Sequence, residues 1–91
     1  AETLSRSLEV KPDQADAYSG LGWVSYGREQ YDEAEAPFRR AIDLAPNDGG
    51  NYYWLGLTLQ QLGRTDEARQ AYQTAIELGN AFAQEALDSL E

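Results

Sequence analysis

The stretch Leu44-Ala45-Pro46-Asn47-Asp48 separates two segments of the chain that repeat one another at a spacing of 34 residues. Pro46 marks the joint, because proline cannot continue a helix and biases the residue before it towards extended structure. A fixed spacing of this size is typical of a solenoid built from stacked helical or strand units. The segments on the two sides of this joint therefore decide the fold.

Matching residues recur on both sides of the joint. Leu21-Gly22 returns as Leu55-Gly56, and Asp32-Glu33-Ala34 returns as Asp66-Glu67-Ala68. Further pairs at the same spacing are Tyr18 and Tyr52, Phe38 and Tyr72, Ala41 and Ala75, Ile42 and Ile76, and Leu44 and Leu78.

This pattern resembles the tetratricopeptide repeat, in which a Leu-Gly pair lies in a first helix, and alanines flank an aromatic residue in a second. A proline stands at the exit of each such unit, as Pro46 does here. The second copy departs from the pattern where Asn80 replaces this proline. An earlier partial copy, formed by Leu4, Ser7-Leu8, Val10 and Pro12, is similar to the second helix of a unit whose first helix is missing.

The resemblance implies an all-α fold, a tetratricopeptide-repeat α-solenoid of antiparallel helix pairs in a right-handed superhelix. We expect about two and a half repeats and a C-terminal helix within one domain, residues 1–91. Its parts are the second helix of a truncated repeat at 1–14, repeats at 15–48 and 49–82, and a capping helix at 83–91.

Local signals place the helix ends. Asp13, Asp32 and Asp66 are expected N-caps, because their carboxylates can accept hydrogen bonds from free backbone N–H groups. Gly63 and Gly79 are expected to end helices in a left-handed conformation. The helices predicted in this way span residues 2–11, 15–28, 32–45, 50–62, 66–78 and 81–90.

The buried faces follow from helical spacing. Tyr18, Leu21, Gly22 and Ser25 form the stripe that we expect to face a partner helix. Gly22, like Gly56 in the second repeat, allows close helix approach because it has no Cβ, although it lowers helix propensity by about 1 kcal/mol relative to Ala. The expected stripe of the second helix is Ala34, Phe38, Ala41 and Ile42.

Composition limits the chemistry. The 91 residues include sixteen acidic and seven basic side chains, a net charge of −9, with no cysteine and no histidine. Thiol nucleophiles, thiolate zinc sites and histidine bases are therefore absent. The acidity disfavours nucleic acid and anionic membranes as partners, and no apolar run is long enough for membrane insertion.

Three patterns that suggest chemistry have a simpler structural interpretation. The carboxylate pairs at 32–33 and 66–67 fit helix N-termini better than an acid–base pair, since they recur in both repeats. Residues 47–51 lack the ligand spacing of a calcium loop and read as a turn. Gly20 and Gly22 follow no strand and do not predict a phosphate site. We therefore predict no enzyme, and no catalytic, cofactor-binding or metal-binding residue.

Several polar and aromatic residues of the first helices lie off the packing stripe. The resemblance implies that the first helices line a concave surface, where rigid aromatic side chains commonly bind partners. The predicted peptide-binding groove consists of Ser19, Trp23, Tyr26, Tyr53, Leu57 and Gln60. Trp54 stands at the edge of this face. The alternative is that Trp23 and Trp54 belong to the core between repeats.

The expected function is a non-catalytic scaffold that binds a peptide segment of a partner protein. One subclass of tetratricopeptide proteins holds acidic chaperone tails with Lys, Arg and Asn, but the matching positions here carry no cation. An apolar or cationic peptide is therefore the expected partner. The alternative is a structural spacer or self-assembly segment that associates through its terminal helices, and the sequence indicates no compartment.

Overall fold

The computed structural model describes residues 12–90, and within this range the chain forms five helices and no strand. The predicted helix 2–11 and the final residue, Glu91, lie outside the described residues. The helices, in chain order, are α2 (Pro12–Gly27), α3 (Tyr31–Leu44), α4 (Gly49–Gln61), α5 (Thr65–Glu77) and α6 (Phe82–Leu90).

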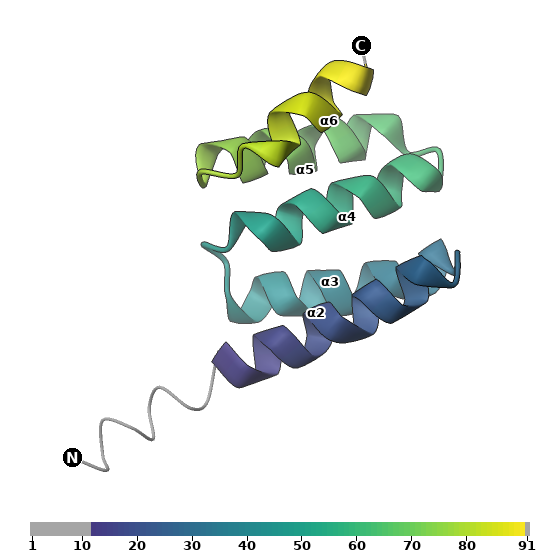
Figure 1. Cartoon of the computed structure of the whole chain (residues 1–91), viewed down its shortest axis with the longest axis vertical. Coiled ribbons are helices and arrows are strands. Elements are labelled where there is room, and N and C mark those ends of the chain that lie inside the picture. Colours follow the sequence, from purple (N-terminus) through teal and green to yellow (C-terminus); the bar gives the residue numbers. More distant parts are fainter. Residues whose placement is uncertain (1–11, 91) are drawn as a thin grey trace, which may run out of the picture.

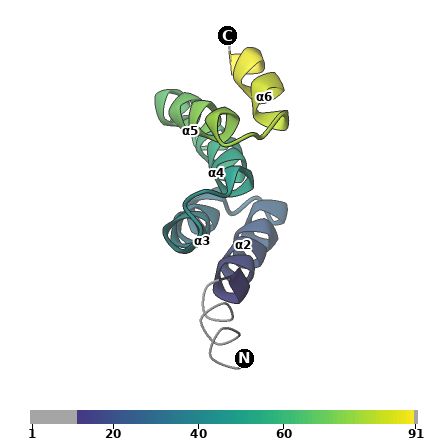
Figure 2. The same ribbon diagram turned by 90° about the vertical axis from the view of Figure 1, so that its left-hand side faces the viewer.

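The five helices stack as antiparallel neighbours from α2 at one end to α6 at the other (Figure 1). The pairs α2–α3 and α4–α5 make the most extensive contacts, α3 packs on α4, and α6 packs on α5. Seen from the side, α3 and α5 lie to the left, α2 and α6 to the right, and α4 between them (Figure 2). The predicted all-α architecture is confirmed. We call α2, α4 and α6 the first helices, and α3 and α5 the second helices.

The two repeated glycines bring the helices of each pair into close contact. A Cβ built on Gly22 would lie 2.6 Å from Cε1 of Phe38, and one on Gly56 would lie 2.5 Å from Cε1 of Tyr72. Both rings are fully buried. Each ring therefore occupies the space that a side chain at the glycine would need.

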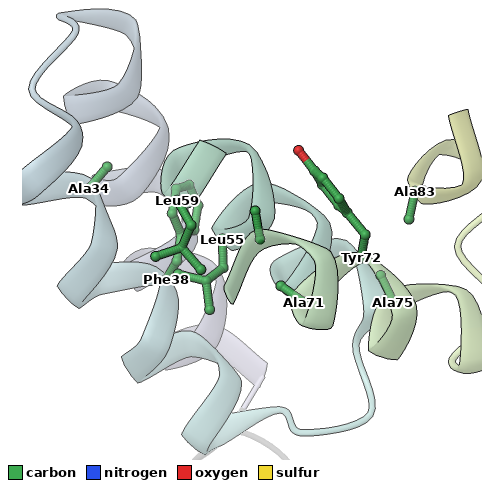
Figure 3. Packing of buried hydrophobic residues seen from close by; sticks show 9 residues of the cluster. Ala34, Phe38, Leu55, Leu59, Ala71, Tyr72, Ala75 and Ala83 are labelled. Carbon is green, nitrogen blue, oxygen red and sulfur yellow. The ribbon is translucent and has the colours of Figure 1, made fainter. Parts of the chain in front are cut away.

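The core runs continuously along the stack (Figure 3). Phe38 of α3 lies with Leu55 and Leu59 of α4, and Tyr72 of α5 lies towards Ala83 of α6. The buried core residues of this cluster are Ala34, Phe38, Leu55, Leu59, Ala68, Ala71, Tyr72, Ala75 and Ala83. Small residues on the second helices thus permit close packing on both sides of each helix.

Three predicted N-caps are wrong. Helix α2 already includes Asp13, and the N-caps of α3 and α5 are Gln30 and Arg64, neither of which caps its helix through its side chain. Asp32 and Asp66 lie instead in the first turns. Their carboxylates are favourable there because the N-terminal end of a helix carries partial positive charge.

The turns use other devices. The carboxylate of Asp48 caps α4 by accepting a hydrogen bond of 2.9 Å from the backbone N–H of Gly50. Gly63 and Gly79 have φ angles of +82° and +98°, which confirms the predicted left-handed ends. Glu29, at the equivalent of Gly63 in the first repeat, has a φ of 63° without being glycine.

The predicted packing stripe of α2 is only partly correct. Gly22 is buried, but Leu21 is 56% exposed, whereas its counterpart Leu55 is 4% exposed. The reason lies outside the helix, since α3 packs on α4 while no helix among residues 12–90 precedes α2. No helix in this range is both long and apolar enough to cross a bilayer.

Candidate binding surface on the first helices

Four aromatic rings form a continuous row across the first helices. Trp23 of α2 lies 6.1 Å from Trp54 of α4, Trp54 lies 5.8 Å from Tyr53, and Tyr53 lies 6.3 Å from Phe82 of α6, all between ring centroids. We call these four residues the ring row. It connects helices that are far apart in the sequence.

The ends of the ring row are open. Trp23 is 50% exposed and Phe82 is 70% exposed, whereas Tyr53 and Trp54 are half-buried. Trp54 also stacks on the buried ring of Phe38, with an interplanar angle of 15° and a centroid distance of 6.3 Å. Trp54 therefore contacts the core on one side and the ring row on the other.

Two further residues of the predicted groove border the ring row. The ring of Tyr26 lies 5.6 Å from that of Trp54 in an edge-on arrangement, and 5.1 Å from that of Tyr31. Burial raises the pKa of the Tyr26 hydroxyl, so this group stays neutral. Leu57 is half-buried and lines a hollow between α4 and α6 together with Tyr53.

The polar groups of the other two predicted residues are engaged within the protein. Ser19 is 6% exposed, and its hydroxyl donates a hydrogen bond of 2.6 Å to Oδ1 of Asn51, joining α2 to α4. The hydroxyl of Tyr72 donates to Oε1 of Gln60 over 2.7 Å, and burial raises the pKa of Tyr72. Ser19 thus joins α2 to α4 in the interior. Gln60 is bonded to α5 but also lines the hollow between α4 and α6.

Sequence reasoning left Phe82 out of the site and placed Trp54 at its edge. Trp54 stands 34 residues after Gly20, so the first repeat offers no aromatic counterpart. Phe82 begins α6 and is the last residue of the predicted repeat 49–82, where the equivalent residue of the preceding repeat is Asp48. Its position after a glycine-ended helix and its apolar ring were the only available signals.

The charges of the two sides of the stack differ. Within the described part of the chain, the first helices contain four acidic residues and no Arg or Lys, and α4 carries no charge at all. The arginines of residues 12–90 lie on the second helices and in the turns, at positions 28, 39, 40, 64 and 69. A ligand on the first helices therefore meets aromatic and acidic groups.

Ion pairs join the two second helices on the opposite side. Glu35 accepts hydrogen bonds from Nε of Arg39 at 2.8 Å and from Nη1 of Arg64 at 2.7 Å, and Arg64 also pairs with Glu67 at 2.6 Å. Burial raises the pKa of Glu35, but the two arginines outweigh it and lower the pKa overall. The Glu35 carboxylate therefore remains ionised.

A second hollow lies over these helices and is lined by Arg39, Tyr52 and Glu67 among others. Its charged groups already pair with one another, with 3.9 Å between Arg39 Nη2 and Glu67 Oε1. Among residues 12–90, no group of three acidic side chains is placed to hold a metal ion. The ring row is thus the more open candidate for a ligand.

Comparison with known proteins identifies the family. Residues 15–48 and residues 38–70 each match a sequence model of the tetratricopeptide repeat. The chain is therefore a tetratricopeptide repeat protein, as its period and its helix pairs indicate. Domains of this family are generally protein–protein interaction modules and are typically non-catalytic.

Several larger proteins contain similar sequence. The chain is 31% identical over 85 residues to the peroxisomal targeting signal receptor of Candida albicans, covering 89% of this chain and 14% of the receptor. The receptor of the same name from Eremothecium gossypii is 38% identical over 74 residues, which cover 81% of this chain and 12% of the receptor. DnaJ homolog subfamily C member 7 of Mus musculus is 32% identical over 81 residues, or 89% of this chain and 15% of that protein. The chain thus spans less than a sixth of these relatives.

Proposed function

We propose that this chain is a non-catalytic module that binds a peptide segment of a partner protein along its first helices. The ring row is the observation that carries this proposal. Its four aromatic rings lie next to one another in space along the first helices, and helix packing within the repeats does not require such a row. Exposed contiguous apolar surface on a folded domain commonly marks a binding site. Some of the relatives are themselves named as receptors for a targeting signal.

The partner segment in this proposal is apolar with basic residues. Its apolar side chains pack on the ring row, and its cations match the acidic, arginine-free first helices. Charge complementarity of this kind steers association and excludes acidic competitors. The absence of any described cation on these helices argues against an acidic peptide.

The test uses peptides selected from a display library of short random sequences, with the strongest binder synthesised for titration. Trp23→Ala should lower its affinity by about 2 kcal/mol or more, roughly thirtyfold. The free energy of unfolding should change by no more than about 1 kcal/mol, because the Trp23 ring is half exposed in the free protein.

Leu21→Ala is the matched control, because Leu21 is similarly exposed on the same helix. It stands two residues before Trp23 and therefore lies about 200° around the helix from it. The control variant should leave peptide affinity unchanged. A loss of stability above about 3 kcal/mol in Trp23→Ala would place that residue in the core instead. Equal affinity losses in the two variants would remove the ring row as the binding site.

A second candidate function rests on the exposed end of the stack at α2. Leu21 and Val24 are 56% and 55% exposed, although their counterparts Leu55 and Thr58 are buried. We infer that a further helix covers this end of the stack, packed on α2 as α3 packs on α4. The second candidate function is therefore that of a structural unit within a longer stack of helices.

The helix that the sequence predicts over residues 2–11 lies outside the described residues. Leu4, Leu8 and Val10 stand 34 positions before the apolar residues Phe38, Ile42 and Leu44 of α3. Replacing both Leu21 and Val24 by Glu should then lower the melting temperature of a protein that stays monomeric in sedimentation experiments. Association that the double variant abolishes would make a second copy the occupant, and an unchanged melting temperature without association would eliminate this candidate.

A further inference from the structure

A hollow between α4 and α6 lies at the Phe82 end of the ring row. Its apolar wall includes Tyr53 and Leu57 from α4, and Phe82 and Ala86 from α6. The rings of Tyr53 and Phe82 are tilted by 41° to one another with 6.3 Å between centroids. We call this hollow the α4–α6 pocket.

The exposure of Phe82 has no explanation in the packing of the helices. The ring is 70% exposed, and the burial of α6 on the stack comes from Ala83 and from the half-buried Ala86, Leu87 and Leu90. Phe82 therefore presents a large exposed apolar face in the lining of the pocket. A ligand group that covered it would remove this surface from water.

Glu85 supplies the only formal charge in the lining of the pocket. It stands one helical turn after Phe82, so both side chains lie on the same face of α6. Among the described residues, neither a hydrogen bond nor an ion pair engages its carboxylate. The next acidic residue of the helix, Asp88, differs, since its Oδ1 accepts a hydrogen bond of 3.1 Å from Gln84.

We propose that the α4–α6 pocket receives an arginine side chain of the bound peptide. The aliphatic stem lies against Leu57 and Ala86, the guanidinium covers the ring of Phe82, and the carboxylate of Glu85 accepts its N–H groups. This inference rests on the proposed peptide-binding function and assigns one ligand residue within it.

Arginine fits this combination better than other side chains. Its planar guanidinium is weakly hydrated, stacks on aromatic faces and pairs with carboxylates in a fork geometry. Its stem can cover apolar surface while the charged end stays near water. An apolar ligand side chain in the pocket would shield the Glu85 carboxylate from water without pairing its charge, which is unfavourable. An acidic side chain would be repelled by the same carboxylate.

The experiment compares peptides selected from the same display library by three proteins: the wild type, Glu85→Lys and Asp88→Lys. The wild type should enrich arginine at one position beside apolar residues. Glu85→Lys should replace it by Asp or Glu at that position while the apolar residues remain. Asp88→Lys makes the same charge change on the same helix outside the pocket, and should still select arginine.

Titration of the selected peptide gives the second readout. Replacing its arginine by uncharged citrulline should weaken binding to the wild type roughly tenfold, since a charge-assisted contact is lost. Replacing arginine by citrulline should change the affinity for the Glu85→Gln protein very little. Replacing the arginine by lysine should lower the affinity for the wild type by an intermediate amount. Circular dichroism melting of each variant verifies that the stack remains folded.

The outcomes separate this inference from the proposed function. Arginine that persists in selection by Glu85→Lys would overturn the pocket assignment, while peptide binding that depends on Trp23 would still support the groove. Selection of purely apolar peptides by the wild type would likewise overturn the assignment of arginine to the pocket. A library that yields no binder at all would overturn both.

Discussion

Gly56 illustrates how a single missing side chain controls a helix pair. A Cβ at this position would lie 2.5 Å from a carbon of the fully buried Tyr72 ring, so the ring or the helix must shift to admit it. Gly56→Ala should therefore lower the free energy of unfolding by about 1–3 kcal/mol, despite the better helix propensity of alanine. Urea unfolding monitored by circular dichroism measures this change.

Gly20 provides the matched control within α2. No atom lies within 4 Å of a Cβ built there, so Gly20→Ala should stabilise the protein by up to about 1 kcal/mol. Opposite signs for the two substitutions support close packing at Gly56. Stabilisation by both would mean that helix propensity alone governs these sites.

Glu29 holds a left-handed backbone conformation that residues other than glycine adopt at a cost. Its φ is 63°, and the equivalent residue of the next repeat is Gly63 with a φ of +82°. Glu29→Gly should raise the free energy of unfolding by about 0.5–1 kcal/mol, because relief of strain exceeds the added chain entropy. Gly63→Ala, the reciprocal variant, should be destabilised, and a neutral result for both in thermal melts would refute the strain.

At the scale of helices, the period and the apolar spacing predicted every described helix to within three residues at each end. The starts of α3 and α5 were placed one residue late because an aspartate in a first turn resembles an N-cap in sequence. The two roles share the same favourable electrostatics. An N-cap and a first-turn residue differ in their backbone dihedral angles, which the pattern of residues along the sequence does not specify.

The ion pairs of Glu35 connect the second helices and respond to pH. The pKa of Glu35 is lowered in the folded state, below an unfolded value of about 4.3. Its contribution to stability is therefore complete above that pH and is lost as the pH falls through the folded-state pKa. Glu35→Gln should be less stable than wild type near neutral pH, and the difference should close in acid.

Thermal melts between neutral pH and the acid range measure this dependence. Glu77→Gln, at the end of α5, serves as control because Glu77 is exposed and forms no ion pair among the described residues. A constant difference between Glu35→Gln and wild type at all pH values would contradict the linkage.

For the whole molecule, the net charge of −9 should oppose folding. Screening by sodium chloride reduces repulsion between separated surface charges, so the melting temperature should rise with salt. An uncharged osmolyte at equal osmolality distinguishes screening from general solute effects. A melting temperature that stays constant as sodium chloride is added would show that charge repulsion does not limit the stability of the fold.

The site was less predictable than the fold because it depends on neighbours across the stack. Helical spacing predicted Trp23 and Tyr53 as site residues. The ring of Trp54 lies between their rings and contacts both, and Trp54 has no aromatic counterpart in the first repeat. The exposure of Leu21 likewise reflects what packs on α2 and not its own sequence. Repetition predicts equivalent positions, whereas burial depends on where each unit lies in the stack.

The chain contains only two tryptophans, and both belong to the ring row. Excitation of indole fluorescence therefore samples this one surface, with Trp54 towards the core and Trp23 towards solvent. Because the centroids of the two rings are 6.1 Å apart, their electronic transitions should couple and give a paired band in the circular dichroism spectrum. The emission maximum should move to shorter wavelength when a peptide displaces water from Trp23, so the protein needs no attached dye to report occupancy.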